Sequence, residues 1–349
     1  MSYWPDRGDL AATFTTVLIG SAGAGLAWLV SFPVYLLTGP ALAASLAGMA
    51  GMRLVIAPPL RDAAFLVIGI GIGTGVDGRA ANAVLHWPVA FVVLAAMLFA
   101  ILLVCRALLS RYFGFDAKSA VLAASPGHLS YVLGLGLAVD ADIGRVAVVQ
   151  SFRLLVLTLC VPFVAMLFGM QGGGSILPMG APMSGAHLAV LLVLAMAIGF
   201  GLQRLRVPAA LLIGAMGLSS VTHLTDLTPG VLTPTIALPC YVVLGTLIGT
   251  RFSGISRRML RGALFAGLVS TSVTLALAAL AAVPVALWLE MDTAHVFVAF
   301  APGGLETMLA MGTVLGADPG FVAACHVGRL MLLTVLVPLA MPKAARPVP

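Results

Sequence analysis

Of the 349 residues, 61% are hydrophobic and only 9% are charged, and apolar runs recur along the whole length. This composition excludes a soluble globular domain and predicts a membrane protein with several spans. The net charge of +6 comes from basic residues spread thinly between the apolar runs. They are typical of topology signals in loops, so we expect no binding to nucleic acid.

Ten apolar runs are predicted to cross the membrane as α-helices. They form two membrane repeats, residues 1–168 and 186–349, joined by the uncharged linker 169–185 with its glycines and prolines. In chain order the runs are 10–30, 39–56, 60–76, 84–108, 143–168, 186–202, 208–222, 233–250, 262–288 and 319–341.

The two halves of the chain are related by a duplication. Residues 124–162 align without a gap on residues 300–338, which matches Pro126 with Pro302 and Arg153 with Arg329. The duplication extends upstream, because Gly69, Gly73 and Thr74 match Gly245, Gly249 and Thr250, and Pro40-Ala41 resembles Pro208-Ala209. Glycines at four-residue spacing favour close approach of helix backbones in lipid.

Each repeat also contains an apolar segment broken by Pro-Gly, residues 117–139 and 293–316. If these segments are re-entrant hairpins, nearly all Lys and Arg residues fall on one side of the membrane, with Arg79 opposite. If the segments cross, that bias disappears. Because Lys and Arg concentrate in cytoplasmic loops, we predict hairpins, both termini in the cytoplasm, and two inverted five-span repeats. Inverted repeats with broken helices are typical of secondary transporters.

The Pro-Gly breaks are the predicted substrate-binding elements. Ser125 is expected to cap a helix with Pro126 in its first turn, and Pro302 is expected in the same place after Ala301. Free N–H groups at such helix starts attract an anion or a carboxylate. The alternative is a pair of kinks filled by neighbouring side chains. Further residues expected at the breaks are Gly127, His128, Gly303 and Gly304.

A helix with one arginine follows each break. Asp142 and Asp318 precede these helices and are expected to cap them. Arg153 and Arg329 come about three turns later, roughly 16 Å into an apolar core of about 30 Å. A buried arginine is costly, so each is expected to face a cavity, a partner or an anion. Pairing with a hairpin carbonyl or with Glu306 is the structural alternative.

Glu306 is the acid placed well inside an apolar segment, one turn after Pro302. It could carry a coupling proton or serve as the fixed counter-ion of an arginine, and the sequence favours neither. His326 and its counterpart Gln150 lie three residues before the arginines and would extend a polar lining. The pattern of histidines and cysteines indicates neither a metal site nor a cofactor.

The chain resembles the AbrB-type bacterial inner-membrane proteins, a family with this duplicated hydrophobic region. The resemblance covers nearly the whole chain and is most specific at Ala301-Pro302-Gly303-Gly304 with Glu306 and Met308, at Ala317-Asp318, and at His326 with Arg329. It departs in the first copy at His128 and Ser130. The family is labelled as regulators of AidB expression or as ammonia monooxygenases, and it is not the soluble DNA-binding AbrB.

The resemblance implies a multi-pass protein of the bacterial inner membrane. The architecture favours a transporter or exporter of a small anionic metabolite, and not an enzyme. A membrane regulator or sensor affecting gene expression is the second hypothesis, and a monooxygenase subunit is the third. The expected partners are the anionic substrate and the lipid bilayer; a homo-oligomer is left open.

Overall fold

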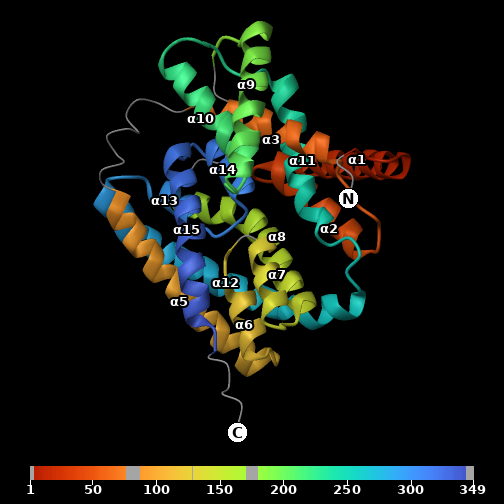
Figure 1. Ribbon diagram of the computed structural model, residues 1–349, viewed down its shortest axis with the longest axis vertical. Helices are drawn as coiled ribbons and strands as arrows, with labels where there is room; N and C mark the ends of the chain where they lie inside the picture. Colours follow the sequence, from red (N-terminus) through yellow and green to blue (C-terminus); the bar gives the residue numbers. More distant parts are fainter. Residues whose placement is uncertain (1–3, 76–86, 128, 170–179, 343–349) are drawn as a thin grey trace.

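The computed structural model describes residues 4–75, 87–127, 129–169 and 180–342. Within these ranges the chain forms 14 α-helices and no β-strand, which confirms the predicted all-α class (Figure 1). The helices are α1 Arg7–Leu29, α2 Tyr35–Met49, α3 Pro58–Gly73, α5 Trp87–Phe113, α6 Ala117–Ala124, α7 Leu129–Ala138, α8 Ile143–Leu167, α9 Gly185–Arg204, α10 Ala210–Leu224, α11 Pro234–Thr250, α12 Arg257–Leu289, α13 Thr293–Phe300, α14 Leu305–Val314 and α15 Pro319–Ala340.

Six of these helices, α1, α5, α8, α9, α12 and α15, are long and apolar enough to cross a membrane. Each of the ten predicted runs contains a helix, with ends shifted by a few residues. The largest difference is in the run 39–56, where α2 ends at Met49 and residues 52–57 are not helical. Gly51 adopts φ 101° there, a conformation that ends a helix. Most of the predicted linker, residues 170–179, lies outside the described ranges.

Both Pro-Gly segments are broken helices with matching bounds: α6 and α7 occupy the same positions of the first copy as α13 and α14 of the second. The predicted caps are wrong, however. Ser125 and Ala301 are the C-terminal caps of α6 and α13, and neither Pro126 nor Pro302 lies in the next helix. A residue before proline is driven into extended backbone, so each helix must end there.

The helices form two bundles, and each half of the chain contributes to both (Figure 1). The first bundle contains α1, α2, α3, α9, α10 and α11, in which α3 packs on α10 and α2 packs on α11. The second bundle contains α5 to α8 and α12 to α15, in which α12 packs on α8 and α5 on α15. In the other half, α3 and α10 correspond to α11 and α2, and α12 and α8 correspond to α5 and α15. The two contacts within each bundle are therefore the same contact made twice. The main contacts between the bundles join α2, α3 and α11 to α8 and α14.

The predicted close approach at the paired glycines is confirmed. A Cβ atom added to Gly69 would lie 2.5 Å from the carbonyl oxygen of Leu212 on α10, and one added to Gly245 would lie 2.5 Å from that of Leu37 on α2. At such distances only glycine allows the two backbones to touch. The duplicated glycines therefore set the helix crossings of the first bundle.

One predicted equivalence is wrong. Pro40 lies inside α2, whereas Pro208 precedes α10, so Pro40-Ala41 does not correspond to Pro208-Ala209. The structural counterparts are Val34 and Ala209, which cap α2 and α10 in left-handed conformations with φ 52° and 49°. A local Pro-Ala match could not distinguish a proline within a helix from one before it.

The helix starts of the duplicated core are capped as predicted. The Asp142 carboxylate accepts from the backbone N–H of Arg145 at 3.0 Å, and the Asp318 carboxylate accepts from that of Phe321 at 2.7 Å. Both aspartates therefore have the structural role expected of them.

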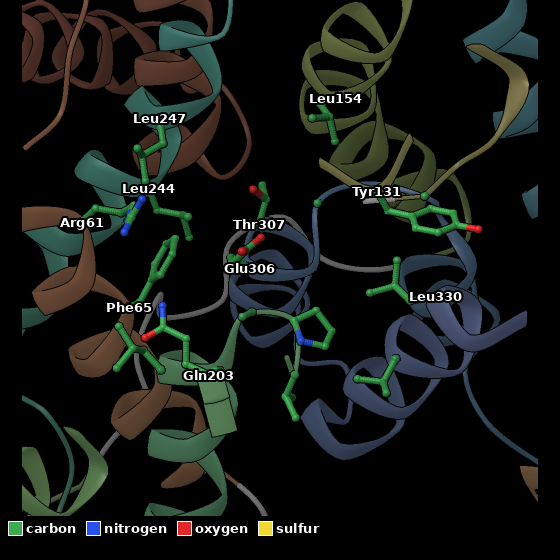
Figure 2. A pocket seen from close by; sticks show the side chains of 18 of the residues that line it. Arg61, Phe65, Tyr131, Leu154, Gln203, Leu244, Leu247, Glu306, Thr307 and Leu330 are labelled. Carbon is green, nitrogen blue, oxygen red and sulfur yellow. The ribbon is translucent and has the colours of Figure 1, made fainter. Parts of the chain in front are cut away.

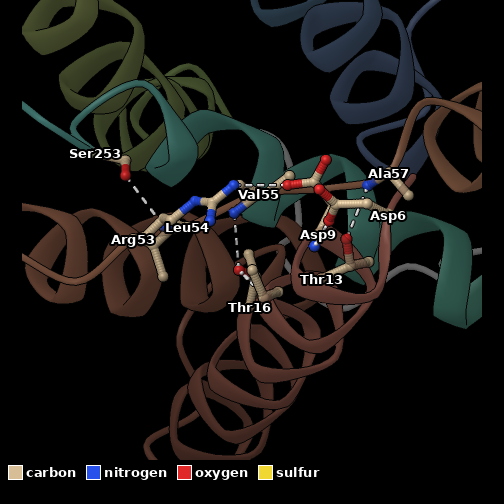
Figure 3. A network of polar contacts seen from close by, with 10 residues as sticks. Asp6, Asp9, Thr13, Thr16, Arg53, Leu54, Val55, Ala57 and Ser253 are labelled. Carbon is tan, nitrogen blue, oxygen red and sulfur yellow. Dashed lines mark hydrogen bonds and ion pairs between the residues drawn. The ribbon is translucent and has the colours of Figure 1, made fainter. Parts of the chain in front are cut away.

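The start of α3 is fixed by a polar network (Figure 3). In the extended segment before it, the backbone N–H groups of Val55 and Ala57 donate to the hydroxyls of Thr16 and Thr13 on α1, each at 3.0 Å. The N–H of Leu54 donates to the Ser253 hydroxyl at 3.0 Å. Since the N–H groups of Leu54, Val55 and Ala57 donate to these hydroxyls instead of to helix carbonyls, the hydroxyls hold the first turn of α3 in place.

Candidate functional site between the two bundles

The first helix break is held by side chains from α8. Pro126 has no N–H that could donate to the Leu122 carbonyl one turn earlier. The side-chain amide of Gln150 donates to that carbonyl instead, at 2.8 Å, and also to the Ser125 carbonyl at 2.7 Å. One Arg153 Nη donates to the Ser125 carbonyl at 3.0 Å, and the other donates to the Gln150 side-chain oxygen. The Leu122 and Ser125 carbonyls at the break are thus satisfied by two buried side chains.

The second break is held by α15 in a simpler way. Arg329 donates to the carbonyl of Ala301 at 3.2 Å and to that of Gly303 at 2.9 Å. His326, the counterpart of Gln150, instead places Nδ1 3.0 Å from the Val322 carbonyl of its own helix. Its Nε2 has no partner among the described residues. The second break therefore depends on one guanidinium group.

The two arginines are the most costly groups in this region. Each is only 3% exposed, and their like charges repel each other. Neither forms an ion pair with a carboxylate within the described ranges, Glu306 included. Their carbonyl contacts are those of the structural alternative, and a direct role in substrate binding stays a prediction.

A cavity of about 760 Å³ lies between the bundles (Figure 2), and a glycine of each break lines it. The first bundle contributes α3, α11 and the connection from α9 to α10, and the second contributes both breaks with α8, α14 and α15. In Figure 2, Glu306 and Thr307 lie between a wall with Phe65 and Leu244 and a wall with Leu154 and Leu330. The cavity is therefore lined by both halves and by both bundles.

Five charged side chains line the cavity, three basic and two acidic. Arg61 is neutralised by its neighbour Asp62, whose carboxylate accepts from Nε and pairs with Nη2 at 2.8 Å. Arg206, Arg251 and Glu306 have no hydrogen-bond or ion-pair partner for their side chains among the described residues. Arg251 and Glu306 are near enough to attract each other electrostatically. The unpaired charges favour a ligand with at least one negative group.

The start of α14 adds uncharged donors. Its cap is Gly304, which has no side chain to accept from the first-turn N–H groups. Thr307 in that turn is 6% exposed, lines the cavity, and makes no side-chain hydrogen bond within the described ranges. A ligand oxygen at this end would meet the Thr307 hydroxyl and the helix N-terminus together.

The residues predicted from sequence fall into two groups. Gly127, Gly304 and Glu306 line the cavity. Most of the others form the breaks or their supports, and the Oγ of Ser125 is buried without a partner among the described residues. His128 lies outside the described residues. The residues that form or support the breaks are Ser125, Pro126, Arg153, Pro302, Gly303 and Arg329, whereas His326 contacts only a carbonyl of its own helix among the described residues.

Sequence reasoning missed all three basic residues of the cavity wall. Arg61, Arg206 and Arg251 stand at helix ends, where they read as topology signals, and nothing local marks them as parts of one cavity. Thr307 was detectable as a hydroxyl beside Glu306 at a predicted helix start. In the described part of the chain, no three His, Cys, Asp or Glu side chains gather as a metal site would require.

Comparison with known proteins assigns the chain to a family. The model of the family described as "Transition state regulatory protein AbrB" matches residues 36–344. A relative in Escherichia coli (strain K12), named "Putative regulator AbrB", is 26% identical over 314 residues, which cover 88% of this chain and 89% of that protein. "Uncharacterized protein YhjN" of Bacillus subtilis (strain 168) is 26% identical over 298 residues, which cover 78% of this chain and 75% of that protein. The chain thus belongs to the AbrB family, and its apolar helices place it with the membrane AbrB-type proteins rather than with the soluble regulators.

Proposed function

We propose that this protein is a secondary transporter of a small anionic metabolite in the bacterial inner membrane. The observation that carries the proposal is the cavity that both helix breaks line, with three basic and two acidic side chains in its wall. Broken helices in duplicated membrane proteins commonly expose backbone groups that bind substrate. The excess of basic groups favours an anion over a cation.

The two-bundle arrangement suits alternating access. The cavity lies between the bundles, so a movement of one bundle against the other would open it to one side and then to the other. Inverted repeats would provide the two related gates. Helices α3 and α11 are equivalent in the two halves. The start of α3, with Arg61, and the end of α11, with Arg251, nevertheless line the same cavity. Opposite ends of equivalent helices at one site favour opposite orientations of the halves.

The proposed topology predicts which loops each side of the membrane exposes. In a variant without native cysteines, Ala141→Cys should be labelled only from the cytoplasmic side and Asp292→Cys only from outside. Re-entrant breaks in inverted repeats place both ends of the first hairpin on the cytoplasmic face and both ends of the second on the outer face. A membrane-impermeant maleimide added to sealed, oriented vesicles measures this. Labelling of residue 141 from outside would eliminate the hairpin topology.

Transport itself is tested in proteoliposomes by counterflow of labelled lactate, succinate, isocaproate and leucine. We expect at least one probe to accumulate, and Arg251→Gln to reduce its rate by roughly tenfold, because one charge-assisted contact is lost. Arg258→Gln is the matched control, since Arg258 is exposed in the first turn of α12, the helix that follows Arg251, and does not line the cavity. Counterflow equal to that of empty liposomes for every probe would contradict the proposal.

A membrane regulator is the second candidate, favoured by the name of the Escherichia coli relative. It predicts ligand binding without flux. Binding of a probe to the purified protein together with absent counterflow would therefore favour a sensor over a transporter.

A further inference from the structure

The wall of the cavity separates opposite charges that could easily have neutralised each other. Glu306 and Arg251 attract each other, yet they form no ion pair in the described part of the chain. Arg206 is the other basic group there without a partner among the described residues. An acid on one side and two bases on the other therefore remain available to a ligand.

A simple anion fits this arrangement poorly. Its carboxylate would gain from Arg206 and Arg251, but it would also be repelled by the carboxylate of Glu306, which lines the same cavity. The first turn of α14 favours a negative side chain at Glu306, so the acid suits its place in the helix. A ligand that also carries a positive group removes the repulsion and gains a second contact.

The rest of the wall is mainly apolar. Phe65, Leu244 and Leu247 line the cavity from the first bundle, and Leu154 and Leu330 line it from the second (Figure 2). Leu333 of the second bundle lines it as well. Such walls bury an apolar body while a few polar groups orient it. The volume of about 760 Å³ accommodates a ligand of this kind with room for water.

We propose that the ligand is a small zwitterion with an apolar body, of the chemical class of an aliphatic or aromatic amino acid. Its carboxylate lies toward Arg206, Arg251 and the Thr307 hydroxyl, and its ammonium group lies toward Glu306. This inference rests on the proposed transport through the same cavity, and it replaces the simple anion of that proposal with a carboxylate that also carries a positive group. It assigns Glu306 to ligand recognition, where the sequence alone left a choice between proton carrier and counter-ion.

Three probes of similar shape test it: leucine, isocaproate without the ammonium group, and isoamylamine without the carboxylate. We expect leucine to bind the whole purified chain in lipid nanodiscs at least roughly tenfold more tightly than either analogue at neutral pH, since each loses a charge-assisted contact. Glu306→Gln should weaken leucine binding by roughly tenfold and leave isocaproate binding unchanged or tighter. Glu290→Gln, an exposed acid outside the cavity, is the matched control and should bind all three probes like the unmodified protein.

Each other outcome overturns the inference in a recognisable way. If isocaproate binds as tightly as leucine and moves in counterflow, the transporter proposal stands and the zwitterion is wrong. If isocaproate binding strengthens on acidification and Glu306→Gln removes this dependence, Glu306 carries a proton rather than an ammonium contact. If no probe binds and none moves, both proposals fail. A melting curve of each variant excludes loss of fold as the cause.

Discussion

Arg329→Met is expected to reduce flux and ligand binding by about 100-fold, because two hydrogen bonds from a charged group are lost and each is worth about 1.5 kcal/mol or more. Arg329 donates to the carbonyls of Ala301 and Gly303, and Gly304, the next residue, lines the cavity. Removing the guanidinium should displace the start of α14 and with it Glu306. Counterflow and probe binding measure the loss.

Arg153→Met should be milder, with a loss of about tenfold or less, because only one backbone contact depends on Arg153. Gln150 continues to donate to the Ser125 carbonyl when Arg153 is removed, whereas His326 offers no such support in the second copy. The flux and ligand binding of Arg329→Lys should lie between those of Arg329→Met and those of the unmodified protein, since an ammonium group cannot reproduce the planar fork of the guanidinium.

The amount of folded protein in the membrane separates a local effect of the arginines from a loss of fold. The variants should accumulate in the membrane as folded protein, with Arg111→Met at an exposed position as the matched control. An Arg153→Met variant more damaging than Arg329→Met would contradict the support assigned to Gln150. Failure of both variants to accumulate would instead indicate that the arginines stabilise the fold, as expected of groups that satisfy buried carbonyls.

Gly245→Ala is expected to destabilise the protein by about 1–3 kcal/mol, because the new Cβ meets backbone that cannot change rotamer. The atom would lie 2.5 Å from the Leu37 carbonyl oxygen and 3.0 Å from the Leu37 Cα, so α11 and α2 must separate. Gly69→Ala should cost about as much, because the equivalent clash is with the Leu212 carbonyl oxygen at 2.5 Å. Melting temperature in detergent is the measurement.

Two other glycines serve as matched controls, because alanine there is not expected to lower the melting temperature. Gly25 in α1 and Gly217 in α10 have open space where a Cβ would be added. Alanine at either position should leave the melting temperature unchanged or raise it, because alanine favours a helix over glycine. Equal destabilisation by Gly217→Ala and Gly245→Ala would mean that backbone contact does not set the crossing of α11 with α2.

Much of the local structure follows from local chemistry. Asp142 and Asp318 cap α8 and α15 as expected, because a cap depends on residues within one turn. The breaks were placed correctly by their prolines. Their cap assignment failed because the residue before proline is confined to extended backbone, so Ser125 ends one helix and does not begin the next.

The sequence by itself determined that the chain is an apolar, all-helical, duplicated protein with two broken helices, since hydropathy, proline and internal repetition are properties of short segments. Only the tertiary structure decided that three helices of each half form one bundle, and that Arg61, Arg206 and Arg251 share a cavity with Glu306. The physical reason is that these residues belong to segments far apart in the chain. They are brought together by backbone contacts at glycines such as Gly69 and Gly245, whose partners no local pattern names.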